Sequence, residues 1–372
     1  MRGGGLARLG FTVVAAAIAL VFAALITSVV LAATGANPLA AFRWMVNYGT
    51  QPDSVVNILN RATTYYLAAV AVAVGFRMRL FNIGVDGQYR LAAMLAASVG
   101  AMVALPPVLH QTVVIAVAML VGGLWAGIAG VLKVTRGVSE VISTIMLNFI
   151  ATGLVAYLLR PGRLGMRIEG SNNISTQPIP ASGHVSGIPL PGATTEIFGL
   201  IVLAAAVGIG YAVLIDRTRF GFDLRAAGTS APAAQASGVD VRRMILVTML
   251  LSGMIAGLVG IPRLLGASYA YGLNFPTGLG FTGIAIALLG RNHPVGIAFA
   301  ALLWAFLDHS AQILSLNGIA KEVVIITQAT VVLSVVVVYE VVHRVVQARQ
   351  QRAVGERLAA AREREEQEVA AT

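Results

Sequence analysis

The sequence predicts an all-α polytopic membrane protein. Of its 372 residues, 57% are hydrophobic and only 11% are charged, and the mean hydropathy is +0.82. A soluble domain with a solvated surface could not sustain these values. The apolar residues also occur in runs long enough to cross a bilayer, whose hydrocarbon core of about 30 Å needs roughly 20 helical residues.

The charge-free intervals predict about ten transmembrane helices, with eight or nine as alternative counts. The first run could also be a signal peptide, but it is longer than the roughly 7–15 apolar residues of a secretory signal, so we expect an anchoring helix. The expected spans are 11–33, 58–76, 84–105, 113–132, 141–159, 197–215, 244–262, a short or broken helix late in 264–290, 295–307 and 323–339.

The positive charges predict the orientation. Most of the 26 lysines and arginines fall in segments that are cytoplasmic when the N-terminus is inside, so both termini are expected in the cytoplasm. The net charge of +10 is explained by this excess at helix ends. We therefore expect membrane lipid as a partner and no nucleic acid.

Two loops are longer than a helical hairpin requires. The external loop 160–196 is rich in Pro, Ser, Asn and Gly, a composition that predicts an irregular structure. In the cytoplasmic loop 216–243, an alanine-rich centre at 231–236 predicts a short helix between turns at Gly228 and Gly238. Its small residues favour close docking against another surface, and a solvated connection is the alternative.

A polar, glycine-bearing insert, RMRLFNIGVDGQYR, occupies residues 77–90 between two apolar runs. Polar groups are costly at membrane depth, so they are kept where they line a pathway or make a buried contact. This points to a transport subunit. For each candidate the alternative is a hydrogen bond to a neighbouring helix. The candidate pathway residues are Asn82, Asp86, Gln88, Asn148, Asn274 and Gln328.

Four segments together carry a family resemblance. They are FNIGVDGQ (81–88), EVISTIMLNFIA (140–151), FGFDLRAAGTSAPAAQASGVDVRR (220–243) and GFTGIAIALLGRNHPVG (280–296). In combination they resemble permease subunits of bacterial ABC importers for nucleosides and simple sugars, within a superfamily that includes ribose and branched-chain amino acid permeases. Segment 140–148 is more similar to the nucleoside branch. The family more often has glutamate where this chain has Asp86.

The resemblance implies an ABC importer permease-like bundle in the bacterial inner or plasma membrane. It would form the path of a nucleoside, purine or pyrimidine, or of a related simple sugar, delivered by an external substrate-binding lipoprotein. The implied partners are an ABC ATPase and a second homologous permease, which makes a heterodimer. Loop 216–243 would dock in a groove of the ATPase, and the positions implied for coupling are Arg225, Gly228, Ala233, Ala234 and Gly238.

The sequence offers no catalytic residues. It has no GxxxxGK(S/T) phosphate loop, so ATP and Mg are expected on the partner ATPase and no cofactor on this chain. It has no cysteine and no HExxH, and its five histidines are scattered, so no metal site is expected. The alternatives are a branched-chain amino acid permease, a stand-alone secondary transporter and a membrane enzyme.

Two glycine pairs and a charged C-terminal segment are the remaining features of the sequence. The pairs Gly123 with Gly127 and Gly253 with Gly257 are GxxxG motifs in the fourth and seventh spans, and they predict close helix packing. We expect a permease domain over 1–342 and a charged cytoplasmic tail over 343–372.

Overall fold

The structure is a computed structural model that describes residues 18, 21–168, 170, 173–320, 322–335, 337–338, 341 and 344. The chain divides into two units, Arg43–Leu316 and the pair of segments Met1–Phe42 and Asn317–Thr372. In the second of these, the helices Val21–Ala33 and Glu322–Val335 are described, and Thr27 donates a hydrogen bond of 3.3 Å to Thr327. The predicted tail beyond residue 344 lies outside the described residues.

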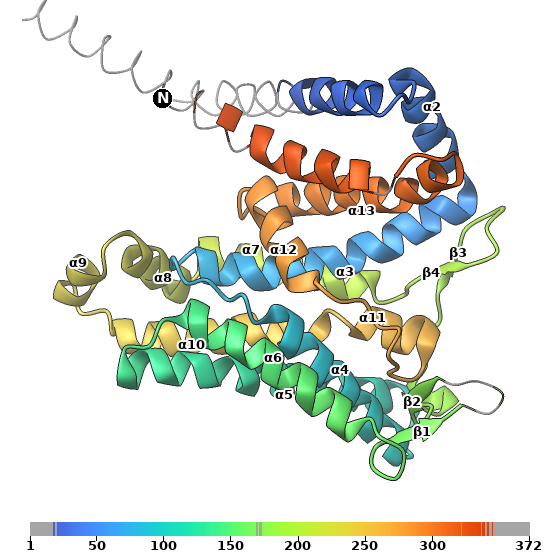
Figure 1. Cartoon of the computed structure of the whole chain (residues 1–372). Helices are drawn as coiled ribbons and strands as arrows, with labels where there is room; N and C mark the ends of the chain where they lie inside the picture. The colour runs from blue at the N-terminus through green and yellow to red at the C-terminus, as the bar shows by residue number, and fades with distance from the viewer. Residues whose placement is uncertain are drawn as a thin grey trace, which may run out of the picture. The chain divides into compact units, whose positions relative to one another are not determined.

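The unit Arg43–Leu316 is built almost entirely of helices (Figure 1). The short strands form two antiparallel pairs, β1 with β2 and β3 with β4. The elements are α2 (Pro38–Gly49), α3 (Pro52–Phe76), α4 (Val85–Met102), α5 (Pro107–Arg136), α6 (Glu140–Leu158), β1 (Gly165–Arg167), β2 (Ile174–Thr176), η1 (Ala181–Gly183), β3 (Ile188–Pro189), β4 (Glu196–Ile197), α7 (Ile201–Arg217), α8 (Arg219–Thr229), α9 (Ala231–Ala236), α10 (Val241–Leu258), α11 (Ile261–Arg263), η2 (Leu264–Ser268), α12 (Leu279–Leu289) and α13 (Pro294–Leu316).

The predicted all-α membrane class is confirmed. Within the described residues, four helices are long and apolar enough to cross a membrane, or up to six if each of two bent helix pairs is one span. Helix α3 and the shorter helices α4 and α12 fall on further predicted spans. The count of ten spans stays a prediction.

Two local expectations were wrong, and two helices were not predicted. The external loop 160–196 is not irregular throughout, because it contains the two strand pairs. Helices α2 and α8 were not predicted, since both carry charged residues inside short amphipathic segments. Gly228 lies within α8 and forms no turn, whereas α9 over Ala231–Ala236 and the turn at Gly238, with φ of +88°, are as predicted.

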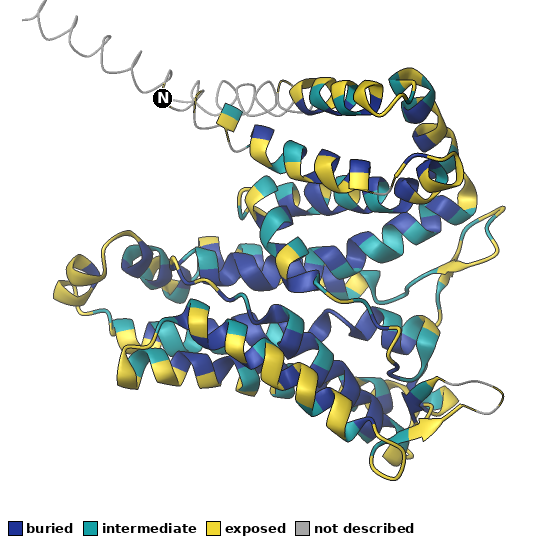
Figure 2. Ribbon diagram, viewed as in Figure 1, coloured by how far each residue is buried: buried dark blue, intermediate teal, exposed yellow. Residues whose placement is uncertain are grey.

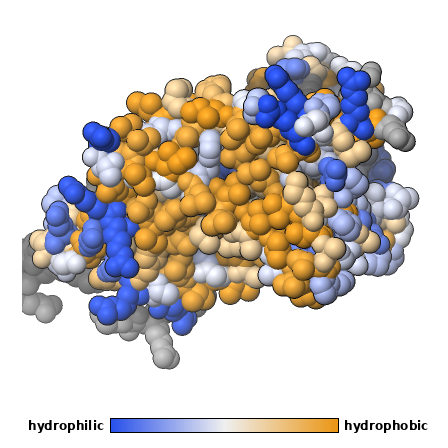
Figure 3. Space-filling model, turned by 90° about the horizontal axis from the view of Figure 1, so that it is seen from below, coloured by the Kyte–Doolittle hydropathy of each residue, from blue (hydrophilic) through white to orange (hydrophobic). Residues whose placement is uncertain are grey.

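Helix α3 forms the centre of this unit. From Leu67 to Val74 every residue is fully buried, and α3 packs against α7, α10, α12 and α13 (Figure 2). A helix that is apolar on all sides is stable only when other helices surround it. By contrast, α5 and α6 expose large apolar side chains, among them Leu120, Leu124, Met146 and Phe149. Figure 3 shows apolar side chains across the middle of this face and hydrophilic ones towards its two ends, as expected for a surface in contact with lipid.

Close packing at the GxxxG motifs is confirmed. Helices α5 and α10 lie against each other, and a Cβ added at Gly253 would lie 2.3 Å from the carbonyl oxygen of Gly122. A Cβ at Gly257 would lie 2.1 Å from the carbonyl oxygen of Ala118, and one at Gly127 would lie 2.9 Å from Leu250. The two helix backbones therefore approach to a separation that only glycine permits.

Figure 1 places α8 and α9 at one end of this unit and the strands β1–β4 at the other. This agrees with the orientation predicted from charge, in which loop 216–243 and loop 160–196 lie on opposite sides of the membrane.

Candidate functional site

A cavity of about 650 Å³ lies within the unit Arg43–Leu316. Residues of α3, α4, β4, the end of α10, α11, η2 and the loop before α12 form its walls. The walls combine aromatic rings with hydrogen-bonding groups. The aromatic residues are Tyr65, Tyr89, Phe198 and Phe275, and the polar or charged residues are Asn57, Asn60, Arg61, Thr64, Thr195, Glu196 and Arg263.

The chain that follows α10 departs from regular α-helix where it lines the cavity. After Leu258 the chain passes through Gly260 and Pro262 into a π-helical turn, Leu264–Ser268, and then reaches Tyr269 in the left-handed region with φ of 51°. Irregular backbone is tolerated at membrane depth only where it is buried in protein or lines a polar cavity. Single π-helical turns are frequent at functional sites.

An ion pair joins α3 to α13 beside the cavity. The Arg61 guanidinium donates to the Asp308 carboxylate, and the Tyr65 hydroxyl donates to the same oxygen over 3.0 Å. Side-chain exposures of 37% and 26% show that the pair is partly desolvated. Such a pair lets an arginine line a cavity within the membrane without an uncompensated charge.

The external loop is fastened over the cavity by α3. The Asn60 amide donates to the Glu196 carbonyl over 3.0 Å and accepts from the Phe198 N–H over 2.7 Å. About two turns earlier in α3, Asp53 accepts hydrogen bonds from the N–H and hydroxyl of Thr194 at 2.7 and 2.9 Å. These bonds hold β4 and Phe198 on the wall of the cavity.

The insert 77–90 forms a buried polar cluster. Asn82 and Gln88 exchange two amide hydrogen bonds of 2.9 and 2.8 Å, and Asn82 also donates to Ser252 over 2.8 Å. Ser252 in turn donates to the Ala71 carbonyl over 2.6 Å. Asn82 is 1% exposed and Gln88 is fully buried. These bonds tie the α3–α4 connection to α10.

Asn148 and Asp86 extend the cluster to α6 and α12. The Asn148 amide accepts from the Gly87 N–H over 2.8 Å and donates to the Ile83 carbonyl over 2.9 Å. The Asp86 carboxylate accepts from the N–H of Leu279, the first residue of α12, over 3.1 Å. It thereby binds a free N–H of the helix terminus.

Among the described residues, none of the six predicted pathway residues lines the cavity. Asn82, Gln88, Asp86 and Asn148 come together in the cluster just described. Asn274 is exposed in the loop before α12, beside Phe275 of the cavity wall, and Gln328 is buried in the helix Glu322–Val335 of the other unit. Their assignment to the pathway stays a prediction.

The sequence carried signals for the cavity that our prediction did not use. Arg61 is an ionisable residue within the predicted span 58–76, Asp308 directly follows the predicted span 295–307, and Gly260 and Pro262 lie at the end of the predicted span 244–262. Intramembrane charges and broken helices are each typical of a pathway. The sequence alone does not bring α3 and the end of α10 together, since about 200 residues separate them.

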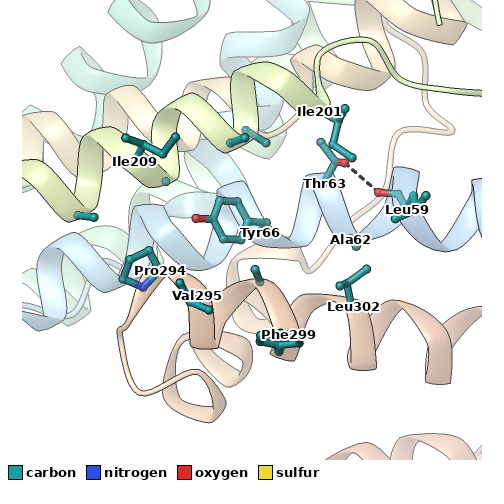
Figure 4. A pocket seen from close by; sticks show the side chains of 15 residues that line it. Leu59, Ala62, Thr63, Tyr66, Ile201, Ile209, Pro294, Val295, Phe299 and Leu302 are labelled. Atoms are coloured by element: carbon teal, nitrogen blue, oxygen red, sulfur yellow. Dashed lines mark hydrogen bonds between the residues drawn. The ribbon is translucent and has the colours of Figure 1, made fainter. Parts of the chain in front are cut away.

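A second cavity, of about 520 Å³, lies between α3, α7 and α13 (Figure 4). Its walls are apolar, with Ile209 and Phe299 on either side of Tyr66, and the Thr63 hydroxyl on its wall already donates to the Leu59 carbonyl over 2.8 Å. It offers almost no hydrogen-bonding partner to a polar solute. The first cavity is therefore the candidate site.

The five predicted coupling residues divide into two groups. Three face the chain itself: Arg225 donates to the Ile215 carbonyl, Gly228 packs on α3, and Ala234 is 4% exposed. A Cβ at Gly228 would lie only 2.4 Å from the Arg77 carbonyl oxygen.

The other two, Ala233 and Gly238, are exposed, as are the neighbouring Ala231, Pro232 and Gln235 of α9. Ser230 caps α9 by accepting from the Ala233 N–H. Helix α9 thus presents a face of small residues at the end of the unit. We call these exposed residues, Ala231–Ala233, Gln235 and Gly238, the docking face.

Arg77 connects this end to other elements. Its guanidinium donates to the Tyr211 hydroxyl over 3.1 Å and to the Asn292 carbonyl over 2.7 Å, and Tyr211 donates to the same carbonyl over 2.8 Å. Asn292 lies in the turn between α12 and α13. Helices α3, α7 and that turn are therefore held together beside α8.

Among the described residues, no three His, Cys, Asp or Glu side chains lie close enough together to hold a metal ion.

Over residues 54–342 the sequence matches the family described as "Branched-chain amino acid transport system / permease component". It is 37% identical over 289 residues to the guanosine ABC transporter permease protein NupP of Bacillus subtilis, with 76% of this chain and 81% of that protein covered. It is 34% identical over 317 residues to the glucose ABC transporter permease protein TsgB13 of Haloferax volcanii, with 82% of each covered. The nucleoside ABC transporter permease protein NupB of Lactococcus lactis is 29% identical over 331 residues, with coverages of 86% and 89%.

Proposed function

Because the chain belongs to this family of ABC transporter permease components, we propose that it forms the translocation path for a nucleoside, with a related simple sugar as the second candidate. It is a multi-pass membrane protein and a transport subunit rather than an enzyme. The lining of the 650 Å³ cavity is the observation that supports this class of solute.

That lining suits a ring-bearing, hydroxylated solute. The rings of Tyr65 and Phe198 offer flat apolar surface, and Thr64 and Asn57 add hydrogen-bonding groups on the same walls. A nucleobase packs on aromatic rings, while ribose hydroxyls donate and accept hydrogen bonds. The guanosine and nucleoside permeases among the relatives support this solute class, and the glucose permease supports the sugar.

Energy for uptake would enter through the docking face. Permeases of this family work with an ATPase and a binding protein, and we propose that the docking face fits the groove of an ABC ATPase that binds ATP and Mg. Arg225, Gly228 and Ala234 hold α8 and α9 on the membrane helices, so that a push on Ala233 or Gly238 moves them as one piece. No cofactor is assigned to this chain.

The remaining partners complete the proposed importer. A second homologous permease would form a heterodimer with this chain, and an external substrate-binding lipoprotein would deliver the solute to the side that carries β1–β4. Asn82, Gln88 and Asn148 would form an inner gate, because their hydrogen bonds hold the α3–α4 connection closed against α6 and α10. Asp86, Asn274 and Gln328 complete the proposed path.

The test is uptake by the complete transporter reconstituted in proteoliposomes with its ATPase, second permease and lipoprotein. We expect ATP-dependent accumulation of labelled guanosine that unlabelled nucleosides compete away. Accumulation of leucine alone would overturn the nucleoside assignment, and accumulation that continues without the ATPase would overturn the importer assignment.

A further inference from the structure

The Tyr89 hydroxyl is a buried donor without an acceptor. Tyr89 lies on the cavity wall and has no exposed surface, and among the residues that the structure describes its hydroxyl has no hydrogen-bond partner. Buried hydroxyl groups are nearly always paired, because an unpaired one loses its bond to water and gains nothing in return. This exception lies on the wall of the candidate site.

Arg263 is a second hydrogen-bond donor on the same wall. It is partly buried and stacks over the Phe275 ring with its guanidinium carbon 5.4 Å from the ring centre. Within the described part of the chain, no carboxylate oxygen lies within 4.0 Å of its nitrogens. A guanidinium has five N–H donors, and an aromatic ring satisfies its charge but not those donors.

The two groups are neighbours. Tyr89 and Arg263 line the same cavity, and Gly260, three residues before Arg263, lies so close to Tyr89 that an added Cβ would be 3.3 Å from its ring. Arg263 directly precedes the π-helical turn Leu264–Ser268. Because the Tyr89 hydroxyl is fully buried, contact with a solute requires a displacement of this part of the wall.

The charges around the cavity identify the class of solute. Arg61 is neutralised by Asp308, and Arg263 shares the lining with Glu196, so the formal charges of these four groups cancel. A wall that is neutral overall and rich in donors favours a neutral solute with acceptor atoms over a phosphorylated one.

We propose that Tyr89 and Arg263 form a specificity-determining contact, in which the hydroxyl and the guanidinium donate hydrogen bonds to acceptor atoms of a neutral nucleobase while its ribose faces Thr64. This proposal rests on the proposed nucleoside import. It means that this subunit itself distinguishes between nucleobases, in addition to any selection made by a binding protein.

The test compares solutes in the reconstituted transporter. Initial uptake rates are measured for guanosine, for its analogue with ring atom N7 replaced by carbon, for uridine and for ribose, with Tyr89→Phe and Arg263→Lys as variants. Tyr89→Phe removes a hydroxyl that makes no bond within the described chain, so the fold should tolerate it. We expect each variant to change the ratio of guanosine to ribose uptake about 5- to 10-fold, the value of one hydrogen bond to a solute.

The matched controls are Tyr157→Phe on the exposed surface of α6 and Arg167→Lys in β1, which should leave that ratio unchanged. An equal loss for all solutes, or no change, would overturn the contact, because a purely structural role has no reason to distinguish them. Preferred uptake of guanosine monophosphate over guanosine would overturn the neutral class. Failure of the unaltered transporter to move any nucleoside would instead refute the proposed function.

Discussion

Replacing Gly253 by alanine should separate α5 from α10 and destabilise the protein. The added Cβ would lie 2.3 Å from the Gly122 carbonyl oxygen and 2.4 Å from the Ala126 Cβ. Ordinary contact begins at 3.4 Å, so the helices must move apart by about 1 Å at this crossing. The oxygen belongs to a helix backbone and cannot rotate aside. Overpacking of this kind costs about 1–3 kcal/mol.

Gly153→Ala is the matched control, because Gly153 also lies in a helix, α6, and a Cβ there meets nothing within 4 Å. Any gain in helix propensity, at most about 1 kcal/mol, applies to both variants and cancels in their difference. That difference therefore isolates the packing cost, which corresponds to roughly 2–6 °C in the midpoint of thermal unfolding in detergent at about 2 °C per kcal/mol.

The same substitution should reduce uptake, since α10 leads directly into the cavity wall at Val259 and Arg263. Equal unfolding midpoints for Gly253→Ala and Gly153→Ala would refute the argument that glycine sets the distance between α5 and α10.

Two further predictions concern the two ends of the unit. Gly228→Ala should push α8 away from the Arg77 carbonyl and lower the amount of solute moved per ATP hydrolysed by about tenfold. Gly210→Ala is the control, because its added Cβ meets nothing within 4 Å. An equal ratio of solute moved to ATP hydrolysed in both variants would contradict a role of α8 in coupling. At the other end, the hydrogen bond from the Thr194 N–H lowers the pKa of the partly exposed Asp53 below 3.8, so this bond is intact above about pH 4 and is lost as the pH falls through the lowered pKa. Protection of the Thr194 amide from hydrogen exchange, corrected for the intrinsic exchange rate, should decline only as the pH falls through the lowered pKa of Asp53. Asp53→Asn should remove this pH dependence. A decline that persists in the variant would contradict the assignment of the bond to Asp53.

The long helices were predictable because apolar runs of crossing length have few other stable structures. Helix α3 is an example of a feature that apolar runs alone do not predict. Its residues 67–74 read as one more span, but their complete burial, which makes α3 the central helix, depends on what surrounds it. Helices α2 and α8 are short and carry charges, so tertiary contacts such as the one between Gly228 and Arg77 decide their structure.

The candidate site was harder to predict for a related reason. Polar residues inside apolar runs are easy to find, but a sequence does not distinguish those that bond to each other from those that face a cavity. Asn82 and Gln88 bond to each other through their side-chain amides, whereas Tyr89, the next residue, leaves its hydroxyl unpaired. Only the packing of α10 against α4 reveals that difference.

Helix α12 is held at both ends by the insert 77–90. Asp86 binds the N–H of Leu279 at its start, and Arg77 binds the Asn292 carbonyl in the turn that follows it. Gly228 of α8 rests on the Arg77 carbonyl, and Leu279 lines the cavity. A chain of direct contacts thus joins the α8–α9 end to the cavity through one polar segment. In each of the two hydrogen bonds a side chain of the insert binds a backbone group next to or within α12, so a movement of α8 that carries Arg77 with it must displace α12, rotate these side chains or break a hydrogen bond.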